Sequence, residues 1–178
     1  YGWANRCCRA PRRPVGAVLY NNSRPIRCGY NGTPSGEDNN CEYEDENGNL
    51  ITKPNVIHAE ANALDKLTEE GNSSGSKDGS LFATTAPCLG CAIRIHNVKI
   101  TTVYFTEIYR GVEGLEHLIK HGVTIKHINL NEEIITTIYQ SDELNNVDNK
   151  IEGILKCREM LDSYVDGSFH KIVNKVII

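Results

Sequence analysis

Two short stretches, His58-Ala59-Glu60 and Thr85-Ala86-Pro87-Cys88-Leu89-Gly90-Cys91, indicate the fold and the chemistry of this chain most strongly. One imidazole and two thiolates would fill three positions around a tetrahedral Zn²⁺ and leave the fourth for water, which is typical of a catalytic zinc site. Glu60 follows His58 by two residues, so it would point toward that water from the first turn of a helix without being a ligand. We therefore predict His58, Cys88 and Cys91 as zinc ligands and Glu60 as the catalytic proton carrier.

Each stretch alone has an ordinary explanation. A lone C-x-x-C is also typical of a redox pair or of half a structural zinc site, and a lone His-Ala-Glu of a simple helix start. Together they match the H-x-E and P-C-x-x-C signature of zinc nucleobase deaminases. The joint pattern therefore predicts a hydrolytic deaminase, and the remaining alternative is a deaminase-like fold that has lost turnover.

The surrounding sequence predicts alternating strands and helices. Runs of β-favouring residues separated by turns predict five strands, at residues 15–20, 25–30, 81–85, 101–106 and 123–128. Apolar residues at helical spacing predict helices at residues 58–69, 88–97 and 111–121. Such alternation is typical of α/β folds, so we expect three layers, αβα, built on a five-stranded mixed sheet.

The chain is expected to divide after residue 130. Residues 1–130 would form the zinc-dependent domain, and residues 131–178 a C-terminal helical extension with helices at 131–140 and 149–164. Such an extension would pack on the core or on another subunit. Within the first part, the polar stretch 31–55 is expected to be a long loop that is either functional or disordered.

Composition limits the cellular setting. The 178 residues carry a formal net charge of -4, and the low sequence pI argues against a nucleic-acid substrate. No apolar run is long enough to cross a membrane, and no signal-peptide pattern is present. The seven cysteines are an odd number that includes a thiolate metal site, so we expect a reducing cytoplasm, which for a viral protein would be that of the host.

Further motifs resemble one branch of the zinc deaminases. Val15-Gly16-Ala17-Val18, Gly29-Tyr30-Asn31-Gly32-Thr33-Pro34-Ser35-Gly36, His58-Ala59-Glu60-Ala61-Asn62-Ala63 and the Pro-Cys-Leu-Gly-Cys run are similar to deoxycytidylate (dCMP) deaminases, including bacteriophage members. The resemblance covers roughly residues 6–130 and implies a cytidine-deaminase-like fold. It also implies hydrolysis of dCMP to dUMP, which supplies thymidylate synthesis, by a homohexamer that dCTP activates and dTTP inhibits, with Mg²⁺ accompanying the allosteric nucleotide.

The resemblance also implies substrate contacts. Asn31 is the expected sugar contact, Ala59 is expected to lie beside the base, and Tyr109 is expected near the substrate. Ordinary alternatives are a turn residue with positive φ for Asn31, a small helix residue for Ala59 and a packing residue for Tyr109. Candidate phosphate or effector contacts are Arg12, Arg13, Arg110, Tyr30 and Gly32; for the arginines the alternative is a solvated basic segment.

Other readings stay open. Phage relatives carry a second, structural zinc, for which Cys7, Cys8 and Cys41 could supply ligands; the alternative is that these cysteines are free or buried. A deaminase that accepts both dCMP and dCTP is the leading alternative function. A nucleotide-binding regulatory subunit without turnover is another, although an intact Glu60 argues against it. tRNA adenosine deaminases and riboflavin-pathway deaminases share the metal signature.

Overall fold

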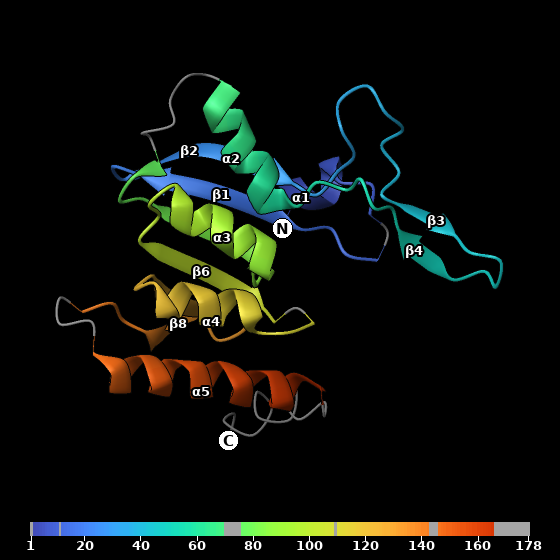
Figure 1. Cartoon of the computed structure of the whole chain (residues 1–178). Coiled ribbons are helices and arrows are strands. Elements are labelled where there is room, and N and C mark those ends of the chain that lie inside the picture. The colour runs from blue at the N-terminus through green and yellow to red at the C-terminus, as the bar shows by residue number, and fades with distance from the viewer. Residues whose placement is uncertain (1, 11, 70–75, 109, 143–145, 166–178) are drawn as a thin grey trace.

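The computed structural model describes residues 2–10, 12–69, 76–108, 110–142 and 146–165. Its central feature is a mixed six-stranded sheet with the order β2-β1-β5-β6-β7-β8 (Figure 1). The strands are β1 (Gly16–Asn21), β2 (Arg24–Tyr30), β5 (Ser80–Thr85), β6 (Thr102–Glu107), β7 (Thr124–Asn129) and β8 (Ile134–Tyr139). The three central strands β5, β6 and β7 are parallel, while β1, β2 and β8 run antiparallel to their neighbours.

Strand β1 turns directly into β2 through a tight hairpin. Its two turn residues, Asn22 and Ser23, have φ of 47° and 60°. Positive φ at both central positions matches the twist of the flanking strands, and asparagine tolerates it well. This hairpin places β2, the strand that contacts the helix after His58, at one edge of the sheet.

Four helices lie side by side across one face of the sheet (Figure 1). They are α2 (Ala59–Glu69), α3 (Leu89–Asn97), α4 (Glu113–Lys120) and α5 (Val147–Val165). Alternate strand residues such as Leu19, Leu81 and Phe105 join apolar residues of these helices in one core cluster. The short helix α1 (Gly2–Cys7) packs against the other face, where its Ala4 meets Gly16. The predicted α/β fold is therefore confirmed.

The expected number of strands and one expected helix are wrong. The sheet has six strands rather than five, because residues 134–139 form the edge strand β8 instead of part of a helix over 131–140. Ile134, Ile135 and Ile138 belong to a β-branched run, which favours an extended strand. The second expected helix of the C-terminal part is present as α5, and its Gly153 packs closely against Tyr139 of β8.

The polar stretch 31–55 contains a small hairpin that the sequence did not predict. Strands β3 (Glu42–Glu44) and β4 (Leu50–Thr52) pair antiparallel. Asp45 closes the turn by accepting hydrogen bonds from the backbone N–H groups of Asn47 and Asn49. The hairpin projects from the sheet near the N-terminal segment (Figure 1). Among the described helices, none is long and apolar enough to cross a bilayer.

Candidate active site

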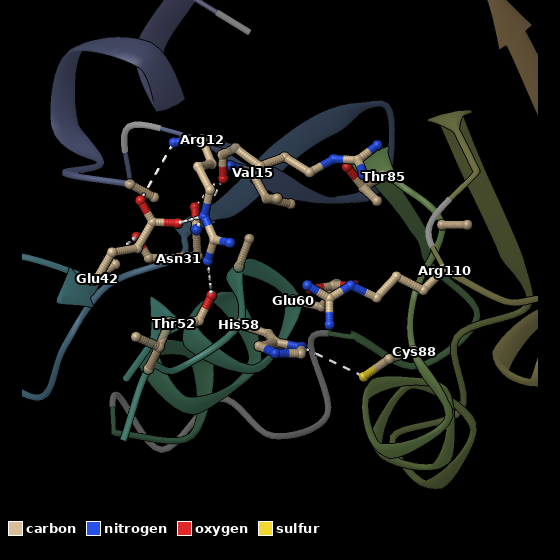
Figure 2. A pocket seen from close by; sticks show the side chains of 16 residues that line it. Arg12, Val15, Asn31, Glu42, Thr52, His58, Glu60, Thr85, Cys88 and Arg110 are labelled. Carbon is tan, nitrogen blue, oxygen red and sulfur yellow. Dashed lines mark hydrogen bonds and ion pairs between the residues drawn. The ribbon is translucent and has the colours of Figure 1, made fainter. Parts of the chain in front are cut away.

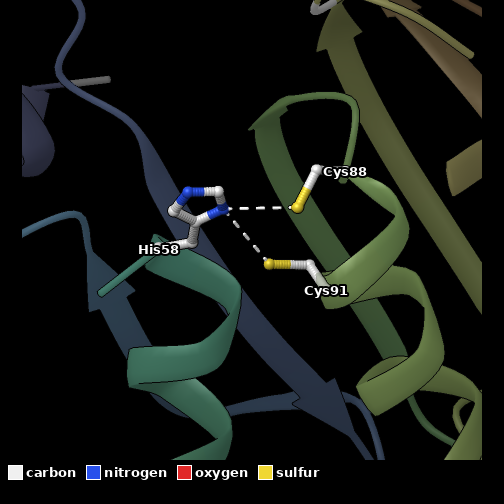
Figure 3. Close-up of side chains that lie close together, drawn as sticks. All are labelled: His58, Cys88 and Cys91. Carbon is white, nitrogen blue, oxygen red and sulfur yellow. Dashed lines mark hydrogen bonds between the residues drawn. The ribbon is translucent and has the colours of Figure 1, made fainter. Parts of the chain in front are cut away.

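His58, Cys88 and Cys91 converge where two helices begin (Figure 3). His58 immediately precedes α2, and its carbonyl accepts the hydrogen bond from the Asn62 N–H that starts the helix. Paired backbone hydrogen bonds between Gly32 and Ile57 fix the residue before it. Cys88 is the N-cap of α3 in an extended conformation, and Cys91 lies in the first turn. The positive end of the α3 dipole therefore faces both sulfur atoms.

The three side chains have the spacing of zinc ligands. The His58 Nδ1 atom lies 3.4 Å from Cys88 Sγ and 3.5 Å from Cys91 Sγ. Zn–N and Zn–S bonds of about 2.1 and 2.3 Å at tetrahedral angles would separate nitrogen and sulfur by about 3.5 Å. The donor set and its spacing therefore fit a zinc ion, and three protein ligands leave one position for water.

Local electrostatics favour a thiolate at this site. Hydrogen bonds from Cys91 and His58 lower the pKa of the Cys88 thiol to about 3. The pKa of Cys91 is raised, mainly because its S–H donates to Cys88 and because it is buried. The hydrogen bond with Cys88 also raises the pKa of His58. Cys88 thus carries the negative charge that a divalent cation would attract.

Glu60 lies in the first turn of α2, close to this cluster. The residue is only 4% exposed. Burial raises the pKa of its carboxyl group, because a buried carboxylate loses the hydration that stabilises its charge. A carboxyl group with a raised pKa accepts and returns protons more readily near neutral pH than an exposed glutamate does.

A cavity of about 300 Å³ opens over the cluster (Figure 2). Its size falls within the range of small-molecule sites. Its walls come from the N-terminal segment, the start of α2, the end of β5, the β3–β4 hairpin and the loop after β6. The residues of the sequence-based prediction that line it are Arg12, Arg13, Asn31, His58, Ala59, Glu60, Cys88 and Arg110.

The three predicted arginines reach the cavity from two sides. Arg12 Nε lies 2.5 Å from Glu42 Oε1, and its guanidinium also donates to Thr52 Oγ1 at 2.8 Å. Arg13 pairs with Glu107 at 2.8 Å. Arg110 extends into the cavity from the loop after β6 (Figure 2). The cavity mouth therefore combines cationic groups from segments that are far apart in the sequence.

The other predicted contacts have different placements. Asn31 Oδ1 accepts hydrogen bonds from the Val15 N–H at 2.7 Å and from the Cys8 thiol at 2.9 Å, and its Nδ2 donates to the Arg13 carbonyl at 3.2 Å. Its amide thus holds the arginine segment against β2, and its φ is not positive, contrary to the turn alternative. Ala59 is fully buried in the cavity wall.

Tyr30 and Gly32 do not line the cavity. The Tyr30 ring lies under the Lys66 ammonium at 5.3 Å, and its carbonyl accepts from Asn62. Gly32 supports the residue before His58 through its backbone. Their expected effector contacts stay predictions, and Tyr109 lies outside the described residues.

Two glycines that support the site were not predicted to do so. A Cβ on Gly29 of β2 would come closer than 3.0 Å to the backbone of Ala59 and Ala63 in α2. A Cβ on Gly114 of α4 would come equally close to the backbone of Pro87 and Cys88. Because glycine lacks a Cβ, β2 can pack closely against α2, and α4 can pack closely against the segment that carries Cys88. A single sequence does not reveal these contacts, because they join residues that are far apart in the chain.

The structure also adds cavity residues from the β3–β4 hairpin. Glu42 and Thr52 line the cavity and hold Arg12, and Cys41 lies beside them. Among the described residues, three potential metal ligands lie within 4.8 Å of one another at two places: at His58, Cys88 and Cys91, and in a second group that contains no cysteine. Cys8 and Cys41 therefore do not belong to a group of three potential ligands.

Comparisons with known proteins agree with this site. Residues 2–107 match the family described as "Cytidine and deoxycytidylate deaminase zinc-binding region". The chain is 33% identical over 130 residues to the deoxycytidylate deaminase of Saccharomyces cerevisiae, covering 68% of this chain but only 40% of that protein. It is 28% identical over 170 residues to the deoxycytidylate deaminase of Enterobacteria phage T4, covering 72% of this chain and 86% of that one.

A solved structure is similar as well. The dCMP deaminase of the cyanophage S-TIM5, crystallised in complex with dCMP and dUMP, is 34% identical and superposes with a TM-score of 0.64. The match covers 71% of this chain and 88% of the cyanophage chain. From the matched region, the ligand geometry and these relatives, we conclude that the chain belongs to the zinc-binding cytidine and deoxycytidylate deaminase family.

Proposed function

We propose that this protein hydrolyses dCMP to dUMP and ammonia. The observation that carries the proposal is the convergence of His58, Cys88 and Cys91 beside a buried Glu60, at a cavity whose mouth holds three arginines. Relatives named deoxycytidylate deaminase, and the cyanophage enzyme solved with dCMP and dUMP, support the substrate. We also propose that the protein is located in the cytoplasm, or in the host cytoplasm if it is viral. A reducing compartment keeps the site thiols from forming disulfides, so that they stay available to a metal ion.

The metal and Glu60 divide the chemistry between them. A zinc ion held by His58, Cys88 and Cys91 would make a bound water acidic enough to act as a nucleophile near neutral pH. Glu60 takes a proton from the attacking water and passes it to ring nitrogen N3 as the new C–O bond forms at C4. Glu60 then takes the remaining proton from the new C4 hydroxyl group and delivers it to the exocyclic amine, so that the C4–N bond breaks, ammonia leaves and C4 becomes a carbonyl.

The cavity wall would recognise the rest of the nucleotide. Ala59 presents little bulk and a backbone N–H to the pyrimidine, and Asn31 is the proposed sugar contact. Arg110 is the proposed partner of the 5′-phosphate, together with Arg12 and Arg13, because guanidinium groups bind phosphate through charge-assisted hydrogen bonds. Arg12 and Arg13 already bond to Glu42 and Glu107, which fixes their position but weakens their share of the attraction. Tyr109 is proposed to lie near the substrate.

We extend the proposal to regulation and assembly. The resemblance supports a homohexamer that dCTP activates and dTTP inhibits, with Mg²⁺ bound by the effector phosphates. Exposed apolar residues on β8 and α5, among them Ile135, Ile151 and Leu155, offer a surface for subunit contact. Mass measurement in solution with and without Mg²⁺-dCTP tests this: a monomer under both conditions would contradict it.

A substrate comparison tests the proposed activity. Zinc-loaded protein is supplied with dCMP, deoxycytidine or dCTP, and the deaminated product is quantified for each. One charge-assisted hydrogen bond to the phosphate is worth a factor of about 10–150, so kcat/KM for dCMP should exceed that for deoxycytidine by at least about tenfold. Comparable consumption of dCTP would replace the proposal by a bifunctional deaminase. Absence of turnover with all three would favour a regulatory subunit.

A further inference from the structure

Three histidines gather between the C-terminal ends of α3 and α4, away from the cavity. His96 lies in the last turn of α3, His117 in the last turn of α4, and His121 caps α4. One ring nitrogen from each can be chosen so that all three lie within 4.8 Å of one another. The His121 ring centroid lies 4.3 Å from that of His96 and 4.2 Å from that of His117. These are half of the six histidines in the chain.

His117 and His121 have the spacing of a helical chelating pair. Residues four apart lie on the same helix face, one above the other. The His121 Nδ1–H donates to the His117 carbonyl oxygen at 2.8 Å. The lone pair of His121 is therefore on Nε2. Metal-binding histidines commonly donate their other N–H to a backbone carbonyl in this way, because the bond fixes the tautomer and the ring orientation.

His117 carries a buried nitrogen without a partner. Its Nε2 atom is inaccessible to solvent and makes no hydrogen bond with any described residue. Buried polar atoms in folded proteins are nearly always satisfied, so such an atom requires an explanation. A metal ion bound at His117 Nε2 would supply the missing partner, and His121 offers its own Nε2 lone pair as a ligand.

We propose that His96, His117 and His121 form a second divalent transition-metal site that joins the end of α3 to the end of α4. Imidazole nitrogens select zinc, copper, nickel or cobalt over magnesium or calcium, which prefer oxygen ligands. Tetrahedral zinc needs nitrogen atoms about 3.4 Å apart, so nitrogens that lie within 4.8 Å of one another would have to approach by at most about 1.4 Å on binding. Because His121 is exposed, its side chain has space for a small shift of this kind.

This site lies away from the cavity, but the two places share helix α3. His96 follows Cys91 by five residues on the same helix, which is about 8 Å along the axis. An ion at the histidines would hold α3, which begins with the thiolate ligands, against α4, whose Gly114 packs on Pro87 and Cys88. Lys99 and Lys120 lie near the rings, but both are exposed and water screens their charge.

Zinc content measures the site directly. Full-length protein is equilibrated with zinc, free ion is removed, and bound zinc is measured by plasma mass spectrometry. We expect about two zinc ions per chain in the parent and about one in His117→Ala and in His121→Ala. Loss of a ligand should weaken binding at this site by at least about 100-fold, more than the loss of an outer partner does. Lys120→Gln, on the same helix, is the matched control and should keep two. Parent-like zinc content in both histidine variants would overturn the proposal.

A second measurement removes the contribution of the cavity. In the Cys88→Ser/Cys91→Ser variant, we expect about one zinc per chain and a thermal midpoint that rises with Zn²⁺ but not with Mg²⁺. Adding His117→Ala should abolish both effects. Absence of a zinc-dependent rise in the double cysteine variant would contradict the site. Neither zinc content nor the thermal midpoint depends on dCMP. A negative result for the histidine site would therefore leave the proposed dCMP hydrolysis untouched, and a lack of dCMP hydrolysis would leave the histidine site untouched.

Discussion

Replacing Glu60 by glutamine removes the proposed proton carrier while keeping the size of the side chain. Glutamine can fill the same buried space and make hydrogen bonds, but it cannot take a proton from water. A single positioned acid or base contributes about 10²–10⁴-fold to a rate. Because Glu60 would serve both proton transfers, we expect kcat to fall toward the upper end of that range, about 10⁴-fold, with KM for dCMP nearly unchanged.

The burial of Glu60 sets the pH dependence. Burial raises the pKa of the carboxyl group above its ordinary value of 4.5. The active form is the carboxylate, so kcat/KM should decline on acidification, with its acid limb above pH 4.5. Folding stability changes with pH in the opposite direction to activity. The folded protein holds this proton more tightly than the unfolded chain does, so the free energy of unfolding falls as the pH rises through the folded-state pKa of Glu60. Glu60→Gln avoids that loss and should be at least as stable as the parent at neutral pH.

The assay is a steady-state measurement of dUMP production on zinc-loaded protein, with zinc content and urea unfolding measured in parallel. Asp65→Asn is the matched control: Asp65 is on the same helix, is 56% exposed and pairs with Arg94 at 3.2 Å. Exposed pairs of this kind contribute at most about 1 kcal/mol, so the control should keep its activity. A Glu60→Gln variant that binds zinc and turns over dCMP within tenfold of the parent would refute the reasoning.

Three further predictions follow from the site. Cys88→Ser should lose one zinc per chain after dialysis, because a thiolate ligand of the proposed site is gone; unchanged metal content would exclude Cys88 as a ligand. Arg110→Ala should raise KM for dCMP about 10–150-fold, because a charge-assisted hydrogen bond to the phosphate is lost, and should leave turnover of deoxycytidine unchanged. Product formation is measured with both compounds, and an equal effect on both would argue against phosphate binding by Arg110. Gly29→Ala should destabilise the protein by about 1–3 kcal/mol in urea unfolding and lower activity, because the new Cβ meets the backbone of α2; a neutral result would contradict the close packing.

The convergence of His58, Cys88 and Cys91 could be predicted from the sequence because the two motifs that carry them are local. His58-x-Glu60 and Cys88-x-x-Cys91 each sit at a helix start, and both helices were predicted within one residue of their observed ends. That the two helix N-termini lie together in the fold is predicted by the joint occurrence of these four residues, which is the signature of zinc nucleobase deaminases. Once the two helices pack side by side on one face of the sheet, their N-termini meet (Figures 1 and 3).

The remaining features depend on contacts that a single sequence does not encode visibly. Residues 131–140 were predicted as helical, although Ile134-Ile135-Thr136-Thr137-Ile138 is a β-branched run that favours a strand. The role of Glu42 and Thr52 depends on where the β3–β4 hairpin folds back, and Arg12 fixes that position through long-range bonds. The histidine cluster combines two helices that pack only in three dimensions, so the spacing of His117 and His121 was its sole local signal.

Product analysis in oxygen-18 water tests the central claim most directly. Zinc-loaded protein is incubated with dCMP in labelled water, and mass spectrometry of the nucleotide is combined with a measurement of released ammonia. Hydrolysis at C4 predicts dUMP that carries one labelled oxygen in its base, formed in equal amount to ammonia and lost when zinc is removed. Unlabelled product, or no dUMP from fully zinc-loaded protein, would contradict the account.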